Sequence, residues 1–145
     1  MIYWDTSCVM KLYTQESDSE FWEKCALGNS AGRVSSALMR TEMSFAFEQK
    51  EARNEIFADA AEELNKQLDR DISKGRFQLI PIGTDVLKSA EGIANKCYHA
   101  KPAIFIRTLD GIHLATAHLL KCRRIATADA RMKIAADFLG FEVFV

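Results

Sequence analysis

Short runs of apolar residues alternate with longer segments in which apolar residues recur every three or four positions. The short runs have the length and composition of buried β-strands, and the longer segments have the spacing of amphipathic helices. We predict strands at residues 1–4, 33–36, 77–82, 124–127 and 141–145. Strands that alternate with helices predict an α/β fold, and the simplest arrangement is a three-layer α/β/α domain around a mainly parallel central sheet.

Capping residues help to place the helices between these strands. Residues 17–20 have the spacing of a capping box, Thr84 and Thr108 are predicted N-caps, and Gly140 suits the end of the last helix. Apolar residues at four-residue steps predict one long amphipathic helix over residues 52–72, and these are Ile56, Ala60, Leu64, Leu68 and Ile72. The other predicted helices follow Asp5 or cover approximately residues 19–28, 37–50, 84–97, 108–119 and 129–139.

Composition favours one soluble globular unit. With 145 residues, 48% hydrophobic and 27% charged, the chain suits a single domain over residues 1–145. No apolar run reaches the roughly 20 residues that span a bilayer, and no signal-like segment opens the chain, so we expect a cytoplasmic protein that does not enter a membrane. The four cysteines form no CxxC pair, which favours reduced thiols over disulfides or zinc. A net charge of −1 indicates that nucleic-acid binding would need a local basic patch.

Four acidic residues occupy positions that such a fold would bring together. Asp5 and Asp129 directly follow predicted strands, and Asp110 lies in the first turn of a predicted helix. Parallel strands share one C-terminal edge, where open α/β folds bind ligands, so we expect these three acids at that edge. Glu42 lies on a largely apolar face of a predicted helix, where a charge needs a partner.

Each acid also has a simpler explanation. Asp5, Asp110 and Asp129 can act as helix caps or first-turn acids, each worth about 1 kcal/mol or less, and Glu42 can be a solvated helix residue. Together, however, these carboxylates would repel one another unless a cation lay between them. Mg²⁺ or Mn²⁺ prefers oxygen ligands and supports hydrolysis of phosphodiesters, with one ion or two.

The acids and their surroundings resemble the PIN-domain nucleases, and among them the VapC-type toxins of bacterial and archaeal toxin–antitoxin pairs. Four segments in order carry the resemblance and span almost the whole chain: YWDTSCVMKLY at 3–13, SSALMRTE at 35–42, LDGIHLATA at 109–117, and ATAD at 126–129 with GF at 140–141. The resemblance implies a PIN-like domain in which Asp5, Glu42, Asp110 and Asp129 are the catalytic and metal-binding acids.

By the same resemblance, three hydroxyl residues would orient metal-bound water or an acid, namely Thr6, Ser7 and Thr127. Cys8 and Gly111 stand where the family more often has Ala, and neither change removes a ligand. Residues 52–101 carry little of the family pattern, and this segment would bear on the choice of substrate.

Other residues have two interpretations each. His113 is interpreted as a core residue or a support for the acids rather than an acid–base catalyst. The stripe on the predicted 52–72 helix would pack in the core, although such helices can also grip an antitoxin by resemblance. Five basic residues near the fourth acid either contact phosphates or are ordinary helix-end and solvated residues, namely Lys121, Arg123, Arg124, Arg131 and Lys133.

The function predicted on this basis is a Mg²⁺- or Mn²⁺-dependent endoribonuclease that hydrolyses RNA and leaves a 5′-phosphate and a 3′-hydroxyl. The resemblance implies a toxin that a small antitoxin holds inactive, and a homodimer. The alternative is a non-catalytic PIN-like module that binds RNA or protein, and the presence of all four acids disfavours it. Aspartyl-phosphate phosphatases also place an Asp after the first strand, but their second Asp is replaced here by Ser7.

Overall fold

The computed structural model describes residues 1–29 and 31–144. The strands are β1 (Ile2–Trp4), β2 (Arg33–Ser36), β3 (Gln78–Ile80), β4 (Arg124–Ala126) and β5 (Glu142–Phe144). The helices are α1 (Thr6–Met10), α2 (Ser19–Leu27), α3 (Leu38–Ala52), α4 (Ala60–Ser73), α5 (Thr84–Tyr98), α6 (Thr108–Leu119) and α7 (Ala130–Phe138). All five predicted strands are therefore present, and the predicted end of the last one, Val145, lies outside the described residues.

The strands form one sheet in the order β3-β2-β1-β4-β5, and every neighbouring pair is parallel. The prediction of an α/β fold with a mainly parallel sheet is confirmed. The chain builds the sheet outward from β1 on one side, through β2 and β3, and later adds β4 and β5 on the other side. The strand order thus reverses between β1 and β4, and a crevice opens beyond the C-terminal ends of strands at such a point.

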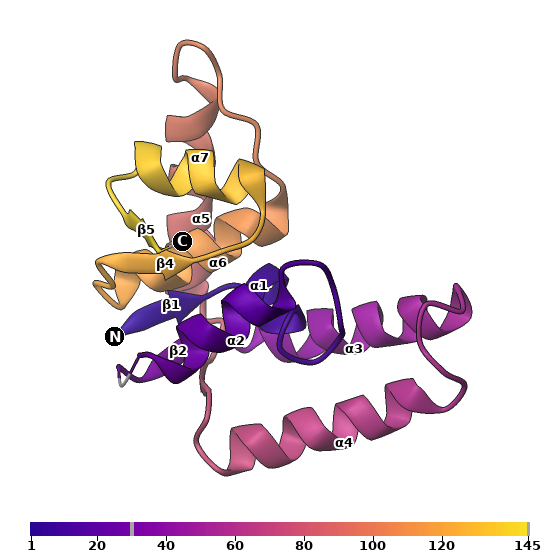
Figure 1. The fold of residues 1–145 in the computed structure, drawn as a ribbon. Helices are drawn as coiled ribbons and strands as arrows, with labels where there is room; N and C mark the ends of the chain where they lie inside the picture. The colour runs from indigo at the N-terminus through magenta and orange to yellow at the C-terminus, as the bar shows by residue number, and fades with distance from the viewer. Residues whose placement is uncertain (30, 145) are drawn as a thin grey trace.

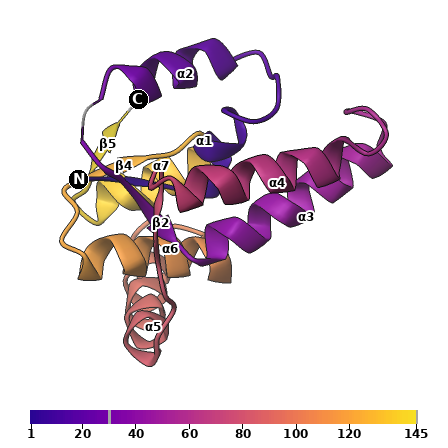
Figure 2. The ribbon, with the colours of Figure 1, turned by 90° about the horizontal axis from the view of Figure 1, so that it is seen from below.

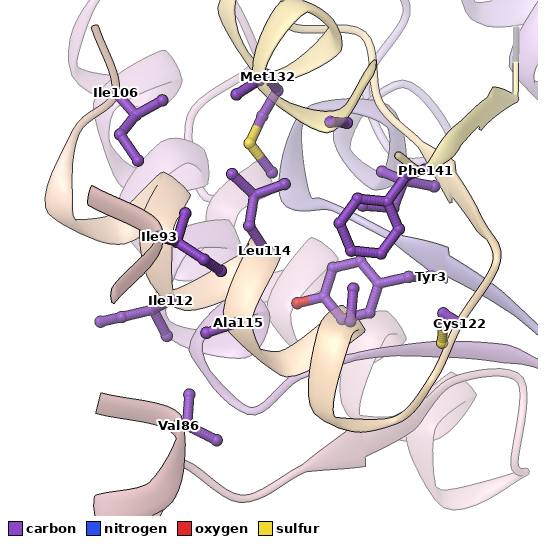
Figure 3. Close-up of a cluster of buried hydrophobic side chains, with 14 of the residues drawn as sticks. Tyr3, Val86, Ile93, Ile106, Ile112, Leu114, Ala115, Cys122, Met132 and Phe141 are labelled. Carbon is purple, nitrogen blue, oxygen red and sulfur yellow. The ribbon is translucent and has the colours of Figure 1, made fainter. Parts of the chain in front are cut away.

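Successive side chains of each strand point to opposite faces of the sheet, so the core has two layers. In β1, Ile2 and Trp4 pack with α1, α2, α3 and α4, whereas Tyr3 packs with α5, α6 and α7. Figure 2 shows α2 on one side of the sheet and α5 and α6 on the other. Figure 3 shows Tyr3 beside Leu114 and Phe141 within the second layer. Both faces of the sheet are covered, and the strands are accordingly apolar or small except at the first residues of β2, β3, β4 and β5, which are polar or charged.

The prediction of one long helix over residues 52–72 is wrong for the first third of that range. The chain turns between α3 and α4, with Asn54 and Asp59 at positive φ values of 56° and 66°, and Ile56 lies in this turn. Asn and Asp tolerate that left-handed conformation, which ends a helix. The two helices then run alongside each other as a hairpin that extends beyond the sheet (Figure 1).

Several predicted caps are also displaced by one residue. Thr84 and Thr108 begin α5 and α6, and the residues that precede them are the N-caps. No capping box forms at residues 17–20, because α2 begins one residue later than that spacing requires, with Asp18 as its N-cap. The side chain of Asp18 accepts from Trp22 Nε1. Asp129 is an N-cap as predicted. The four cysteines are free thiols, and no helix in the described part of the chain is long and apolar enough to cross a membrane.

Truncation of Leu68 tests the packing of α4 on the sheet layer. Leu68 is 0% exposed, so Leu68→Ala should lower the free energy of unfolding by about 2–5 kcal/mol by leaving a cavity. Leu27→Ala is the matched control, because Leu27 is 85% exposed. Urea denaturation measures both variants, and equal losses of stability would contradict this packing.

Candidate active site

The structure brings all four sequence-predicted acids to one cleft of about 670 Å³. Asp5 follows β1 and caps α1, and Asp129 follows β4 and caps α7. These two therefore flank the reversal in strand order. Asp110 enters from the first turn of α6, and Glu42 reaches the cleft from the second turn of α3. Parallel strand ends and helix N-termini thus position three of the acids, and a crossing helix supplies the fourth.

Asp5 is a buried carboxylate held by three donors. Ser7 Oγ donates to Oδ1 at 2.6 Å, the Cys8 amide donates to the same oxygen at 3.3 Å, and Thr127 Oγ1 donates to Oδ2 at 2.6 Å. Burial raises the pKa of Asp5, and the hydrogen bonds from Ser7 and Thr127 oppose that rise. The donors therefore fix the orientation of a group that burial alone would make costly to ionise.

The hydroxyls of Ser7 and Thr127, which donate to Asp5, also connect the ends of β1 and β4. Ser7 Oγ accepts from the amide of Ala128 at 2.9 Å, and Thr127 Oγ1 accepts from the amide of Asp129 at 3.1 Å. One small network thus connects the turn that carries Asp5 with the turn that carries Asp129.

Glu42 is held by a second network on the other side of the cleft. Thr6 Oγ1 donates to Glu42 Oε1 at 2.6 Å, and His113 Nε2 lies 2.5 Å from the same oxygen. The other ring nitrogen of His113 lies 2.7 Å from the hydroxyl of Tyr3. Burial raises the pKa of Glu42, but the hydrogen bond and charge of His113, with the Thr6 bond, outweigh it and lower the pKa overall. His113 is thus buried and supports an acid.

Arg107 is a cleft residue that the sequence analysis did not identify. Its Nε lies 3.1 Å from Oδ2 of Asp110, and its Nη2 lies 3.4 Å from Oδ2 of Asp129. The guanidinium therefore bridges the two acids that lack the hydroxyl networks described above. The signal in the sequence was a basic residue three positions before Asp110, which is the spacing of an N-cap residue and the third residue of the helix that follows it.

Three of the five basic residues named from the sequence lie away from the acids, namely Lys121, Arg123 and Arg124. Lys121 and Arg123 line a separate pocket beside the start of β4, at the opposite edge of the sheet. Arg124 pairs with Glu142 and stacks on the ring of Phe144. Proximity in sequence was misleading here because β4 carries the chain from one edge of the sheet to the other.

The donor set of the cleft suits a hard divalent cation. The four candidate ligands are carboxylates, with hydroxyls beside them, and such oxygen ligands are preferred by Mg²⁺ and Mn²⁺. Over residues 1–29 and 31–144, no three acidic, His or Cys side chains are close enough together to enclose an ion in this arrangement. Arg107 supplies the positive charge between Asp110 and Asp129 instead.

Comparison with known proteins agrees with this architecture. The family model of the PIN domain matches residues 2–137. Ribonuclease VapC46 of Mycobacterium tuberculosis is 33% identical over 144 residues, which cover 98% of this chain and 95% of that protein.

Two solved structures share the fold at low sequence identity. Mycobacterium tuberculosis VapC20, described as a sarcin-ricin loop cleaving toxin, superimposes with a TM-score of 0.70 at 13% identity, over 93% of this chain and 95% of that one. FitAcB from Neisseria gonorrhoeae gives a TM-score of 0.70 at 19% identity, over 100% of this chain and 97% of that one.

Removal of one donor to Asp5 tests the network of hydroxyls. Thr127→Val keeps the shape of the side chain but leaves the buried carboxylate one hydrogen bond short, so the free energy of unfolding should fall by about 1–3 kcal/mol. Thr116→Val is the control, because the buried hydroxyl of Thr116 donates to a carbonyl of its own helix and not to a carboxylate, and its loss should cost under about 1 kcal/mol. Urea denaturation at pH 7 measures both, and equal effects would contradict a special role for Thr127.

Proposed function

The chain belongs to the PIN-domain family, and from this premise we propose that it is a divalent-metal-dependent endoribonuclease that hydrolyses RNA phosphodiesters as the toxin of a toxin–antitoxin pair. The observation that carries the proposal is that Asp5, Glu42, Asp110 and Asp129 line one cleft at the reversal point of a parallel sheet. The 33% identity with a ribonuclease over nearly the full length of both chains supports the same reaction.

We assign Mg²⁺ or Mn²⁺ as the cofactor, with Asp5, Glu42, Asp110 and Asp129 as its ligands. When bound, such an ion supplies positive charge to the phosphoryl group and lowers the pKa of coordinated water. The assignment rests on the oxygen-only character of these side chains and on their common cleft.

The surrounding residues would act by positioning the acids. Ser7 and Thr127 fix both oxygens of Asp5, and Thr6 with His113 fixes Glu42. Carboxylates held in this way need little rearrangement when the reaction begins, which is the main source of electrostatic catalysis. We therefore assign the three hydroxyl residues a supporting role and no direct bond to the RNA.

An exposed aromatic ring gives the cleft a surface for an RNA base. Phe45 lies one turn beyond Glu42 on α3, lines the cleft, and is 75% exposed. An apolar ring in contact with water beside a catalytic site suits an unstacked base, because stacking on aromatic rings accepts every base. We propose that the substrate is single-stranded RNA or an unpaired loop.

The partners proposed from the family are a small antitoxin and a second copy of this chain. Large apolar side chains remain exposed on several elements, and they supply area that a protein partner can cover: Phe57, Leu87, Phe105, Ile134 and Phe138. Free thiols and an RNA substrate are consistent with a cytoplasmic location.

Neutralisation of Asp110 tests the nuclease proposal. In a mixed pool of structured RNAs with Mn²⁺, the intact protein should produce discrete cuts, and Asp110→Asn should lower the rate about 100-fold or more because it removes a charge from the metal site. Asp137→Asn is the matched control on the exposed surface of α7 and should retain full activity.

Gel analysis of end-labelled RNA reads both the rate and the positions of the cuts. Equal cutting by the intact protein and Asp110→Asn would contradict the assigned site. No cutting by any variant, with RNA still bound, would favour the non-catalytic binding module.

Truncation of Phe45 tests the proposed base contact. Loss of one stacked base should lower kcat/KM about 5-fold to 100-fold in Phe45→Ala. Phe57→Ala is the control, since Phe57 is 90% exposed in the turn between α3 and α4, away from the cleft lining. Competition between a single-stranded RNA and its duplex completes the measurement, and a preference for the duplex would contradict base stacking.

A further inference from the structure

Arg107 stands out among the residues that line the cleft because of its charge. Among the described lining residues it is the one Lys or Arg beside four carboxylates. Its guanidinium contacts two of them, at 3.1 and 3.3 Å to Asp110 and at 3.4 Å to Asp129. Carboxylates that share one cleft repel one another unless a cation lies between them. The guanidinium of Arg107 therefore supplies positive charge at the position where a divalent ion would bind.

Asp110 and Asp129 are held by backbone amides, whereas the guanidinium of Arg107 is mostly exposed. The Arg107 side chain is 63% exposed, compared with 10% for Asp110 and 28% for Asp129. Asp110 is also held by the backbone amide of Arg107 at 3.0 Å, and Asp129 by the amide of Arg131 at 2.8 Å. Exposed ion pairs are weak and screened by salt. The guanidinium can therefore leave without any displacement of the carboxylates.

We infer that Arg107 alternates between two partners: the carboxylates of Asp110 and Asp129 in the metal-free protein, and an RNA phosphate when a divalent cation holds these carboxylates. This inference rests on the proposed nuclease function and adds a phosphate-binding residue to it. Arg107 competes with the metal ion before RNA binds and becomes a substrate ligand afterwards. Its position at the exposed rim of the cleft suits the second role.

The chemistry of the guanidinium favours a phosphate as the second partner. Its planar fork presents parallel N–H donors that match the oxygens of a phosphate as well as those of a carboxylate. A cleft with four acids would otherwise repel the RNA backbone, and a released Arg107 places a permanent positive charge beside them.

Substitution of Arg107 should leave the start of α6 intact, so changes in metal or RNA binding can be attributed to the side chain. The capping hydrogen bond to Asp110 comes from the backbone amide of residue 107, and any residue other than proline supplies it. Arg107→Gln removes the charge, and Arg107→Lys keeps the charge but loses the planar fork. Arg123→Gln is the matched control, because Arg123 is exposed at the opposite edge of the sheet.

Calorimetric titration with Mn²⁺ alone tests the competition. Arg107→Gln removes the guanidinium that competes with the metal, so it should tighten Mn²⁺ binding about threefold to tenfold. Arg107→Lys keeps a positive charge but loses the planar fork, so it should tighten Mn²⁺ binding to a smaller degree. Arg123→Gln should bind Mn²⁺ like the unmodified protein. Unchanged or weaker Mn²⁺ binding by Arg107→Gln would overturn the competition.

RNA binding tests the second role of Arg107, as a ligand of an RNA phosphate, and here the substitution should weaken binding. With Ca²⁺ in place of Mn²⁺, and the RNA checked for integrity on a gel, Arg107→Gln should bind single-stranded RNA at least fivefold more weakly. The slope of log affinity against log salt concentration should fall by about 0.7, which corresponds to one phosphate contact. Arg107→Lys should stay within about twofold of the unmodified protein, since Lys also binds phosphates.

The two titrations separate this inference from the nuclease proposal. If the unmodified protein binds and cuts RNA but Arg107→Gln changes neither the RNA affinity nor the salt slope, the phosphate-binding role of Arg107 is wrong and the nuclease proposal stands. An unmodified protein that neither binds nor cuts RNA overturns the nuclease proposal, whatever the result with Mn²⁺.

Discussion

The candidate site depends first on the buried carboxylate of Asp5. It lies at the end of the central strand β1, beside the point where the strand order reverses, and it is satisfied by Ser7, the Cys8 amide and Thr127. Because Ser7 and Thr127 also accept backbone amides that follow β4, the same network sets the relative position of Asp5 and Asp129. Burial raises the pKa of Asp5, and the hydrogen bonds from Ser7 and Thr127 oppose that rise and so favour the charged carboxylate that a cation requires.

Electrostatic balance explains the rest of the cleft. Asp5 and Glu42 are supported by hydroxyls and by His113, whereas Asp110 and Asp129 share the exposed guanidinium of Arg107. Asp5 and Glu42 lie 2.5–2.6 Å from their hydroxyl and imidazole partners, whereas the contacts of Asp110 and Asp129 with Arg107 are longer, at 3.1–3.4 Å. A cation that binds Asp110 and Asp129 would therefore have only an exposed ion pair to displace.

Sequence pattern predicted the parts of the fold that follow from local rules. The strands were found as apolar runs, and Asp5 and Asp129 met because parallel topology brings strand ends to one edge. The turn at residues 53–59 was missed because the four-residue spacing from Ile56 to Ile72 continues through it, although Asn54 and Asp59 adopt positive φ. The contact of Arg107 with Asp110 is local, but its contact with Asp129 and the exposure of Phe45 depend on how the elements around the cleft meet, which no local pattern encodes.

The most direct test of the account is the anomalous diffraction of Mn²⁺ in crystals of the protein. We expect Mn²⁺ in the cleft, coordinated by Asp5 and by at least one of Asp110 and Asp129, with the guanidinium of Arg107 turned away from both. Mn²⁺ found only at other residues, with Arg107 still bridging Asp110 and Asp129 under saturating metal, would contradict the assignment of these acids as the metal site.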